Sequence, residues 1–253
     1  MMKSIVCLFF SMFCLLASAQ VDPGLAKDYF EQGAFEKALT LYQKLRNNQR
    51  SNSYYFLRVI ECHQQLQQYK TAQKEIEAQM KRFKNPQYLV ELGYNYQLQN
   101  QLIQADLNYK KAVQSIEIQS NYVYAVAQRF ETHSLIDYAI QVYEIGLKTQ
   151  PNAAFYYQLA GLYATQQNIE KMMECYLDYV ETNPPYINQV MRVLSEYISE
   201  DANQPYNQLF KNVLLKKLQI KPNPLWNQWL SWLYVQQNDF KKAFIQEKAV
   251  YRR

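Results

Sequence analysis

The chain has 253 residues, of which 49 % are hydrophobic and 19 % charged, with a net charge of +5 and a mean hydropathy of −0.43. This balance is typical of a soluble globular chain and excludes a membrane bundle or a disordered tail. Only 5 glycines and 2 histidines are present, which leaves little material for phosphate-binding loops, metal sites or general-base catalysis. Lysines and arginines are scattered along the chain rather than clustered, so no nucleic-acid partner is expected.

Residues 1–19 have the pattern of a secretory signal peptide. Lys3 precedes an apolar run over residues 4–16, and Ala17-Ser18-Ala19 supplies the small residues of a cleavage site before Gln20. The apolar run is shorter than the roughly 20 residues that span a bilayer. We therefore expect an exported protein whose mature chain, residues 20–253, has no transmembrane segment. The style of the signal and the Gln/Asn/Tyr/Lys-rich usage favour a bacterial periplasm or envelope.

A short pattern then recurs along the mature chain. Its first copy is Gly33-Ala34-Phe35-Glu36-Lys37-Ala38, followed by Tyr42, and the small residue at the sixth position serves as the anchor of the repeat. The anchors are Ala38, Ala72, Ala105, Ala139, Met172 and Ala243. Successive anchors lie 33 or 34 residues apart, except that the last step of 71 covers two repeats, with Phe210 at the missing anchor. The sixth repeat, about residues 186–222, is the divergent one.

Each repeat carries two apolar stripes at helical spacing. In the third repeat the stripes include Leu92, Tyr96, Leu102, Ala105 and Tyr109. The small anchor allows the second helix to approach the first closely, and prolines fall mainly between repeats, where helices must stop. One helix pair cannot bury both stripes, so stacked pairs and a continuous core are predicted.

The spacing resembles that of the tetratricopeptide repeat. The third repeat matches the family pattern best, through Leu92, Gly93, Tyr96, Ala105, Tyr109 and Ala112. The resemblance implies an all-α, right-handed superhelical solenoid of about seven antiparallel helix pairs over residues 20–253. The family also lines a concave face with the first helix of each pair and binds protein or peptide ligands there.

When the family's binding positions are transferred to this sequence by repeat register, the face that they form is rich in tyrosine and glutamine. The candidate peptide-binding residues are Tyr54, Leu57, Gln64, Gln87, Tyr94, Gln97, Tyr124, Gln128 and Tyr157, joined by Glu61, Val90, Glu131, Gly161 and Ala164. Tyrosine offers a large amphipathic contact area, and glutamine can pair with the backbone of an extended peptide. The alternative, that a given tyrosine packs between neighbouring repeats, stays open. Near the end, Trp226, Trp229 and Trp232 recur every three residues; at least one is expected in the core, and Trp229 and Trp232 are candidate partner contacts.

Motifs for chemistry are absent from the sequence. It contains no phosphate-binding glycine motif, no H-E-x-x-H and no G-x-S-x-G, and its carboxylates are distributed singly. Neither enzyme activity nor a metal or cofactor is expected. Cys62 and Cys175 lie three repeats apart, farther than a disulfide can reach, so both are predicted to be free, packed thiols.

The function predicted from these features is that of a non-catalytic protein-interaction scaffold or adaptor of the cell envelope. Three alternatives remain open: the sensor region of a longer signalling receptor, a structural subunit of an envelope or secretion assembly, and a carbohydrate- or peptidoglycan-processing enzyme. The repeats run to Val250 without a polar capping helix. We therefore expect that the chain continues in a longer protein or that a partner caps it.

Overall fold

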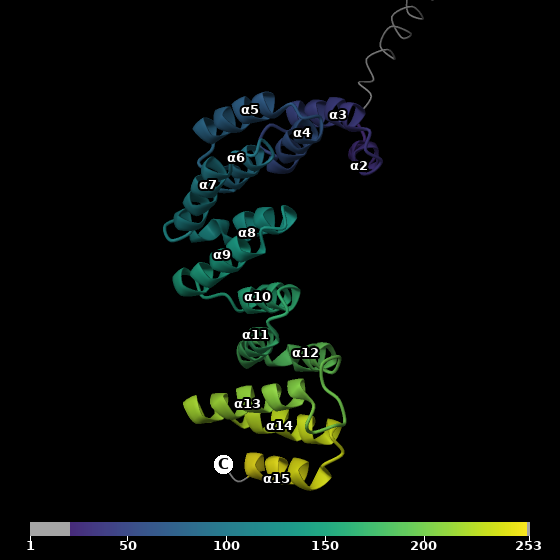
Figure 1. The fold of residues 1–253 in the computed structure, drawn as a ribbon, viewed down its shortest axis with the longest axis vertical. Coiled ribbons are helices and arrows are strands. Elements are labelled where there is room, and N and C mark those ends of the chain that lie inside the picture. The colour runs from purple at the N-terminus through teal and green to yellow at the C-terminus, as the bar shows by residue number, and fades with distance from the viewer. Residues whose placement is uncertain (1–20, 252–253) are drawn as a thin grey trace, which may run out of the picture. The chain divides into compact units, whose positions relative to one another are not determined.

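The computed structural model describes residues 21–251, so the predicted signal peptide lies outside the described residues. This part of the chain is all-helical (Figure 1). The helices are α2 (Pro23–Glu31), α3 (Phe35–Asn48), α4 (Ser53–Gln65), α5 (Tyr69–Arg82), α6 (Gln87–Gln97), α7 (Leu102–Ser115), α8 (Val123–Thr132), α9 (Ile136–Thr149), α10 (Ala153–Thr165), α11 (Ile169–Thr182), α12 (Ile187–Leu194), α13 (Pro205–Ile220), α14 (Pro224–Gln236) and α15 (Phe240–Tyr251). Single 3-10 turns, η2 (Ser120–Tyr122) and η3 (Pro184–Tyr186), precede α8 and α12.

The chain forms two compact units. The N-terminal unit comprises residues up to 84 together with 91–105, and the C-terminal unit comprises 85–90 together with residues from 106 onward. Helices α6 and α7 therefore contribute residues to both units.

Within each unit, helices pack on their neighbours in chain order. In the N-terminal unit α3 packs on α2 and α4, and α4 packs on α5; in the C-terminal unit contacts run in the same way from α8 to α11 and from α13 to α15. Over the described residues this gives seven consecutive helix pairs, from α2/α3 to α14/α15. The predicted fold class, an all-α array of helix pairs, is confirmed, and the handedness of a superhelix stays a prediction.

Asparagine side chains start several of the first helices. The Oδ1 atoms of Asn52, Asn152 and Asn223 each accept a hydrogen bond, 3.0 Å long, from the backbone N–H two residues further on. Each of these bonds satisfies one of the N–H groups that a helix leaves unpaired at its start. The first helix of a pair therefore has a defined starting point after the connection from the preceding pair.

A left-handed residue closes the turn inside six of the seven pairs. Its φ is positive at every one of these positions, which are Gly33, Gln67, Asn100, Ser134, Gln167 and Asn238. Each lies five residues before a predicted anchor. The next residue donates its N–H to the carbonyl five residues back, as Leu135 does to Phe130 (2.8 Å) and Asn168 to Tyr163 (2.9 Å). This is the Schellman arrangement, which ends one helix and sets the direction of the next.

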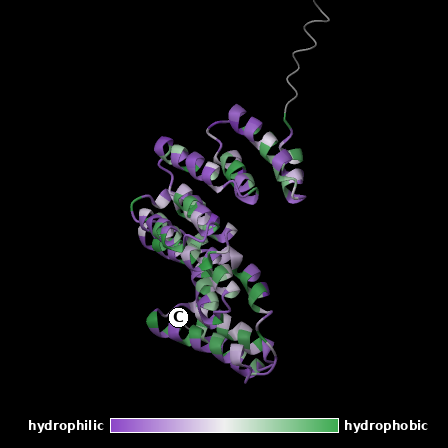
Figure 2. Cartoon of the chain, turned by 45° about the horizontal axis from the view of Figure 1, so that its top comes forward, coloured by the Kyte–Doolittle hydropathy of each residue, from purple (hydrophilic) through white to green (hydrophobic). Residues whose placement is uncertain are grey.

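The predicted anchors are buried in the helix pairs. Ala38, Ala72, Ala139, Met172 and Phe210 are fully buried. The bulky residue four positions later is buried with its anchor in six pairs: Tyr42, Ile76, Tyr109, Tyr143, Tyr176 and Leu214. Hydrophobic and hydrophilic residues alternate along individual helices (Figure 2). The anchor and its bulky neighbour thus belong to the core of these pairs.

The sixth pair has a different connection. Helix α12 has only 8 residues, and Pro205 occupies the position of the left-handed turn residue, where its fixed negative φ forbids that conformation. The longer connection is fastened by the buried Asn207, whose Nδ2 donates to the carbonyl oxygens of Ser199 and Asp201, each at 2.7 Å. A buried side-chain amide therefore replaces the turn that the other pairs use.

Cys62 and Cys175 are free, buried thiols, as predicted. Burial raises the pKa of each thiol to about 12, so both stay protonated near neutral pH. No helix between residues 21 and 251 combines the length and apolar character needed to cross a bilayer.

Replacing the left-handed serine by glycine is expected to stabilise the fold. Ser134→Gly should raise the free energy of unfolding by roughly 0.5–1 kcal/mol, because a residue with a Cβ is strained at positive φ. Asn238→Gly should give a smaller gain, since asparagine tolerates this conformation, and Gly33→Ala should destabilise. Urea unfolding followed by circular dichroism checks the order; equal effects at the three sites would contradict the strained-turn assignment.

Two helical glycines are expected to respond to alanine in opposite directions. A Cβ on Gly146 of α9 would lie 2.9 Å from both Cγ atoms of Val123 and 3.0 Å from Phe155, so Gly146→Ala should cost about 1–3 kcal/mol. A Cβ on Gly161 of α10 would meet nothing within 4 Å, so Gly161→Ala should stabilise by about 1 kcal/mol through helix propensity. Melting midpoints of the two variants test the packing of α8, α9 and α10.

Candidate functional site

A hollow of about 170 Å³ opens in the C-terminal unit among α8, α9 and α10. Tyr124, Gln128 and Glu131 line it from α8, Tyr143 from α9 and Gln158 from α10. The three α8 residues share one helix face because they stand at i, i+4 and i+7. Three residues placed on the binding face from sequence register thus surround one cavity.

Tyr124 forms an aromatic wall at this hollow. Its ring packs edge-on against Phe155, with centroids 5.0 Å apart, and against Tyr143, with centroids 6.0 Å apart. Yet 43 % of Tyr124 remains exposed. The ring is therefore held in position by its neighbours and still offers surface to a ligand.

Glu131 supplies the charged group of the hollow. The hydroxyl of the buried Tyr143 donates a 3.1 Å hydrogen bond to Glu131 Oε1. Burial raises the pKa of the Glu131 carboxyl, and the bond from Tyr143 opposes part of that rise. The pKa of Tyr143 is raised as well, by burial and by the neighbouring carboxylate, so its hydroxyl remains a donor.

These groups together suit an amphipathic ligand. Tyr124 can pack against an apolar portion, the exposed Gln128 can both donate and accept hydrogen bonds, and Glu131 can accept from an amide or a cationic group. A cationic group beside Glu131 would also relieve the cost of its half-buried charge.

In the N-terminal unit the corresponding face of α4 is partly closed. Tyr54 is 45 % exposed and accepts a 3.3 Å hydrogen bond from Arg58 Nε, while the Arg58 guanidinium pairs with Glu61 at 2.8 Å. Leu57 and Gln64, both expected on the binding face, are buried. Only Tyr54 of the predicted α4 residues therefore presents a large exposed surface.

The predicted α6 residues differ in their exposure. Gln87 is buried, whereas Tyr94 and Gln97 are half-buried. The pKa of Tyr94 is raised, first by burial and then by nearby Glu91. Burial at Gln87 leaves little of its amide for a ligand.

Tyr157 belongs to a separate tyrosine cluster. Its ring packs against Tyr176 and Tyr179, with centroids 5.8 and 5.3 Å apart, and its hydroxyl accepts a 3.4 Å hydrogen bond from Gln189. Tyr157 is half-buried there and does not line the hollow around Tyr124. Tyr157 therefore packs between neighbouring helices, which is the alternative that the sequence left open for each tyrosine.

The tryptophans of α14 are buried to different degrees. Trp226 and Trp229 are buried, and Trp229 packs edge-on against Phe210 and Trp232, with centroids 5.8 and 5.5 Å apart. The prediction that Trp229 contacts a partner is therefore wrong for this structure, because the residue is fully buried against neighbouring rings. Trp232 is half-buried and keeps some accessible area.

Two kinds of lining residue were missed from sequence. Gln158 stands one position beyond Tyr157 and enters the hollow from the next helix pair, which register within one repeat does not indicate.

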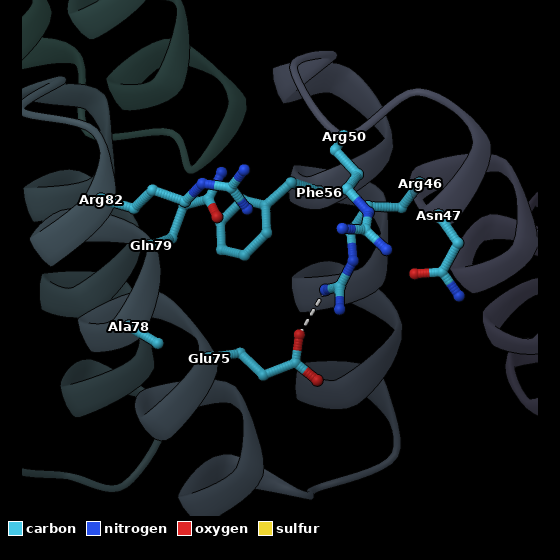
Figure 3. Close-up of a pocket in the computed structure, with 8 residues that line it drawn as sticks. All are labelled: Arg46, Asn47, Arg50, Phe56, Glu75, Ala78, Gln79 and Arg82. Carbon is cyan, nitrogen blue, oxygen red and sulfur yellow. Dashed lines mark hydrogen bonds and ion pairs between the residues drawn. The ribbon is translucent and has the colours of Figure 1, made fainter.

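A second cavity, of about 470 Å³, lies in the N-terminal unit. Its lining includes three arginines and a glutamate: Arg46, Arg50, Arg82 and Glu75 (Figure 3). The available signal was that Arg46 and Arg82 lie in the last turns of the second helices of consecutive repeats.

Between residues 21 and 251, no group of three or more His, Cys, Asp or Glu side chains is arranged to hold a metal ion.

Replacing the Glu131 carboxyl by an amide is expected to stabilise the protein at neutral pH. A folded-state pKa above the unfolded value favours the folded state at low pH, and this advantage is lost as pH rises through the folded pKa. Glu131→Gln should therefore raise the melting midpoint at pH 7 and have less effect at pH 4. The exposed Glu247→Gln is the control and should show no such difference; a pH-independent effect of Glu131→Gln would contradict the buried-charge assignment.

No family model and no curated protein matches the sequence. Among solved structures, the chain is similar to the C-terminal part of a TPR repeat-containing protein from Cytophaga hutchinsonii, at 18 % identity and a TM-score of 0.36 over 89 % of this chain and 93 % of the other. It is also similar to YrrB, described as a TPR protein with an unusual peptide-binding site, at 18 % identity and a TM-score of 0.32 over 69 % and 92 %. A third similar structure is the TPR2AB domain of yeast Sti1 in complex with pHSP90, at 12 % identity and a TM-score of 0.33 over 86 % and 95 %.

Proposed function

We propose that this protein is a non-catalytic interaction scaffold that binds a peptide or a helix of a partner protein on the first helices of its pairs. The observation that carries the proposal is the hollow lined by Tyr124, Gln128 and Glu131. One exposed aromatic ring, one amide and one carboxylate lie on a single face of α8. This helix packs on α9, and the Tyr124 ring also contacts Tyr143 of α9 and Phe155 of α10.

The lining indicates what part of a ligand would enter. An aromatic or aliphatic side chain would pack on Tyr124, and Gln128 would pair with the ligand backbone. A lysine, arginine or terminal amine would meet Glu131. A rigid aromatic residue that loses little entropy on binding is a typical hot spot of protein interfaces.

The proposed setting is outside the cytoplasm, in the periplasm or associated with the cell envelope. The support for this part is the signal-like sequence of residues 1–19. Association with a membrane-bound assembly belongs to the same proposal, with the partner supplying any membrane attachment.

The test is a pull-down from envelope extract with the chain from Gln20 to Arg253 as bait. The test variant is Tyr124→Ala/Gln128→Ala, which removes the exposed ring and the amide at the hollow. The matched control is Tyr206→Ala/Gln208→Ala on α13, which removes the same two residue types from another exposed surface. Circular dichroism establishes that all three baits are equally helical.

We expect partners that the wild type and the control retain and that the test variant loses by at least tenfold. Glu131→Gln should weaken the same partners, since it removes the charge opposite a cationic group. Equal retention by all baits would contradict binding at the hollow, and capture of no partner by any bait would contradict the scaffold function itself.

A further inference from the structure

The cavity of the N-terminal unit has a lining of its own that the proposed function does not use. It is bounded by the last turn of α3, by Phe56 of α4 and by the second half of α5. Arg46 and Arg50 reach into it from one side, and Arg82 reaches in from the other, where Glu75 also stands (Figure 3). Its volume of about 470 Å³ falls within the range of small-ligand sites.

Arg46 is fixed by a chain of ionic contacts. Its guanidinium pairs with Glu75 Oε2 and lies over the Phe56 ring, 5.9 Å from the centroid. The other carboxylate oxygen of Glu75 lies 3.4 Å from Nε2 of the buried His63, whose Nδ1 contacts Gln68 Oε1 at 2.7 Å. When Nδ1 donates to Gln68 and the ring is protonated, Nε2 also carries a proton and directs it towards the Glu75 carboxylate. This interaction with Glu75 raises the pKa of His63. Glu75 is therefore shared between Arg46 and His63.

The other two arginines have no acidic partner among the described residues. Arg82 stacks on Phe83, with its guanidinium carbon 5.1 Å from the ring centroid, and Arg50 is exposed after the end of α3. Both guanidinium groups border the cavity and keep donors free for a ligand.

Positive charge exceeds negative charge around this cavity. Three guanidinium groups face one carboxylate, and the C-terminal ends of α3 and α5 offset about one further positive charge. Lys44, Lys81 and Lys84 lie on the same segments and add to the positive potential. Arginine presents paired donors that match the oxygens of carboxylate and phosphate groups.

We propose that this cavity binds an oxyanion group, a phosphate or a carboxylate, carried by a small ligand whose apolar part packs against the exposed Ala78. Arg50 and Arg82 contact the oxyanion from opposite sides. Arg46 stays anchored by Glu75 and supplies charge from the floor of the site. The site shares no lining residue with the hollow around Tyr124.

The test uses phenyl phosphate and benzoate as probes, with benzyl alcohol as the neutral control, at constant ionic strength. Binding to the chain from Gln20 to Arg253 is followed by amide chemical shifts in two-dimensional NMR. The test variant is Arg50→Gln/Arg82→Gln, and the matched control is Lys44→Gln/Lys81→Gln, which removes the same charge from exposed positions that do not line the cavity.

We expect saturable shifts at Phe56, Ala78 and Gln79 with at least one anionic probe and none with benzyl alcohol. Affinity should fall at least tenfold in the arginine variant and less than twofold in the lysine variant. The stronger probe identifies the oxyanion as phosphate or carboxylate. Equal weakening in both variants would reduce the site to diffuse charge attraction and overturn the proposal, as would the absence of saturable shifts with either anion.

Discussion

The structure depends on one backbone constraint: in six of the seven helix pairs, the chain reverses through a single left-handed residue. Five residues later comes the buried anchor, so the turn and the packing contact are set at a fixed separation. A turn of another length would rotate the second helix and move its anchor off the first. The same left-handed residue recurs at Gly33, Gln67, Asn100, Ser134, Gln167 and Asn238, five residues before the anchor each time. Side chains other than glycine accept the strain at five of these sites because the packing of the pair compensates for it.

The sixth pair shows what happens when that constraint is removed. Proline at position 205 prevents the left-handed turn, and Phe210 replaces the small anchor. The chain takes a longer route between α12 and α13, and Asn207 fastens that route by bonding to the backbone. The cost of burying a polar amide is offset because the amide is fully hydrogen-bonded.

Much of the fold could be predicted from the sequence because the repeat makes local and long-range signals agree. The spacing from Ala38 to Ala243 gave the register of the pairs, and buried anchors follow from it. The candidate site was predicted only in part. Register places Tyr124, Gln128 and Glu131 on one helix face, but whether a side chain stays exposed depends on neighbouring helices. Leu57 and Gln87 occupy the predicted face and are nevertheless buried.

The arginine cavity shows the same limit of sequence-based prediction, here for residues that the sequence did not single out. Arg46, Arg50 and Arg82 look like scattered surface charges when the sequence is read linearly. They converge because consecutive second helices end near one another in this unit, and because Glu75 and His63 hold the first arginine in place. Such convergence depends on the directions of side chains, which periodicity does not supply.

The two buried cysteines give the molecule an internal probe of its own opening. Cys62 lies in the N-terminal unit and Cys175 in the C-terminal unit, and each is a protonated thiol shielded from solvent. A thiol reagent reaches either sulfur only when the surrounding helices separate. The labelling rates of the two sulfurs therefore report the local opening of each unit separately, without an engineered reporter.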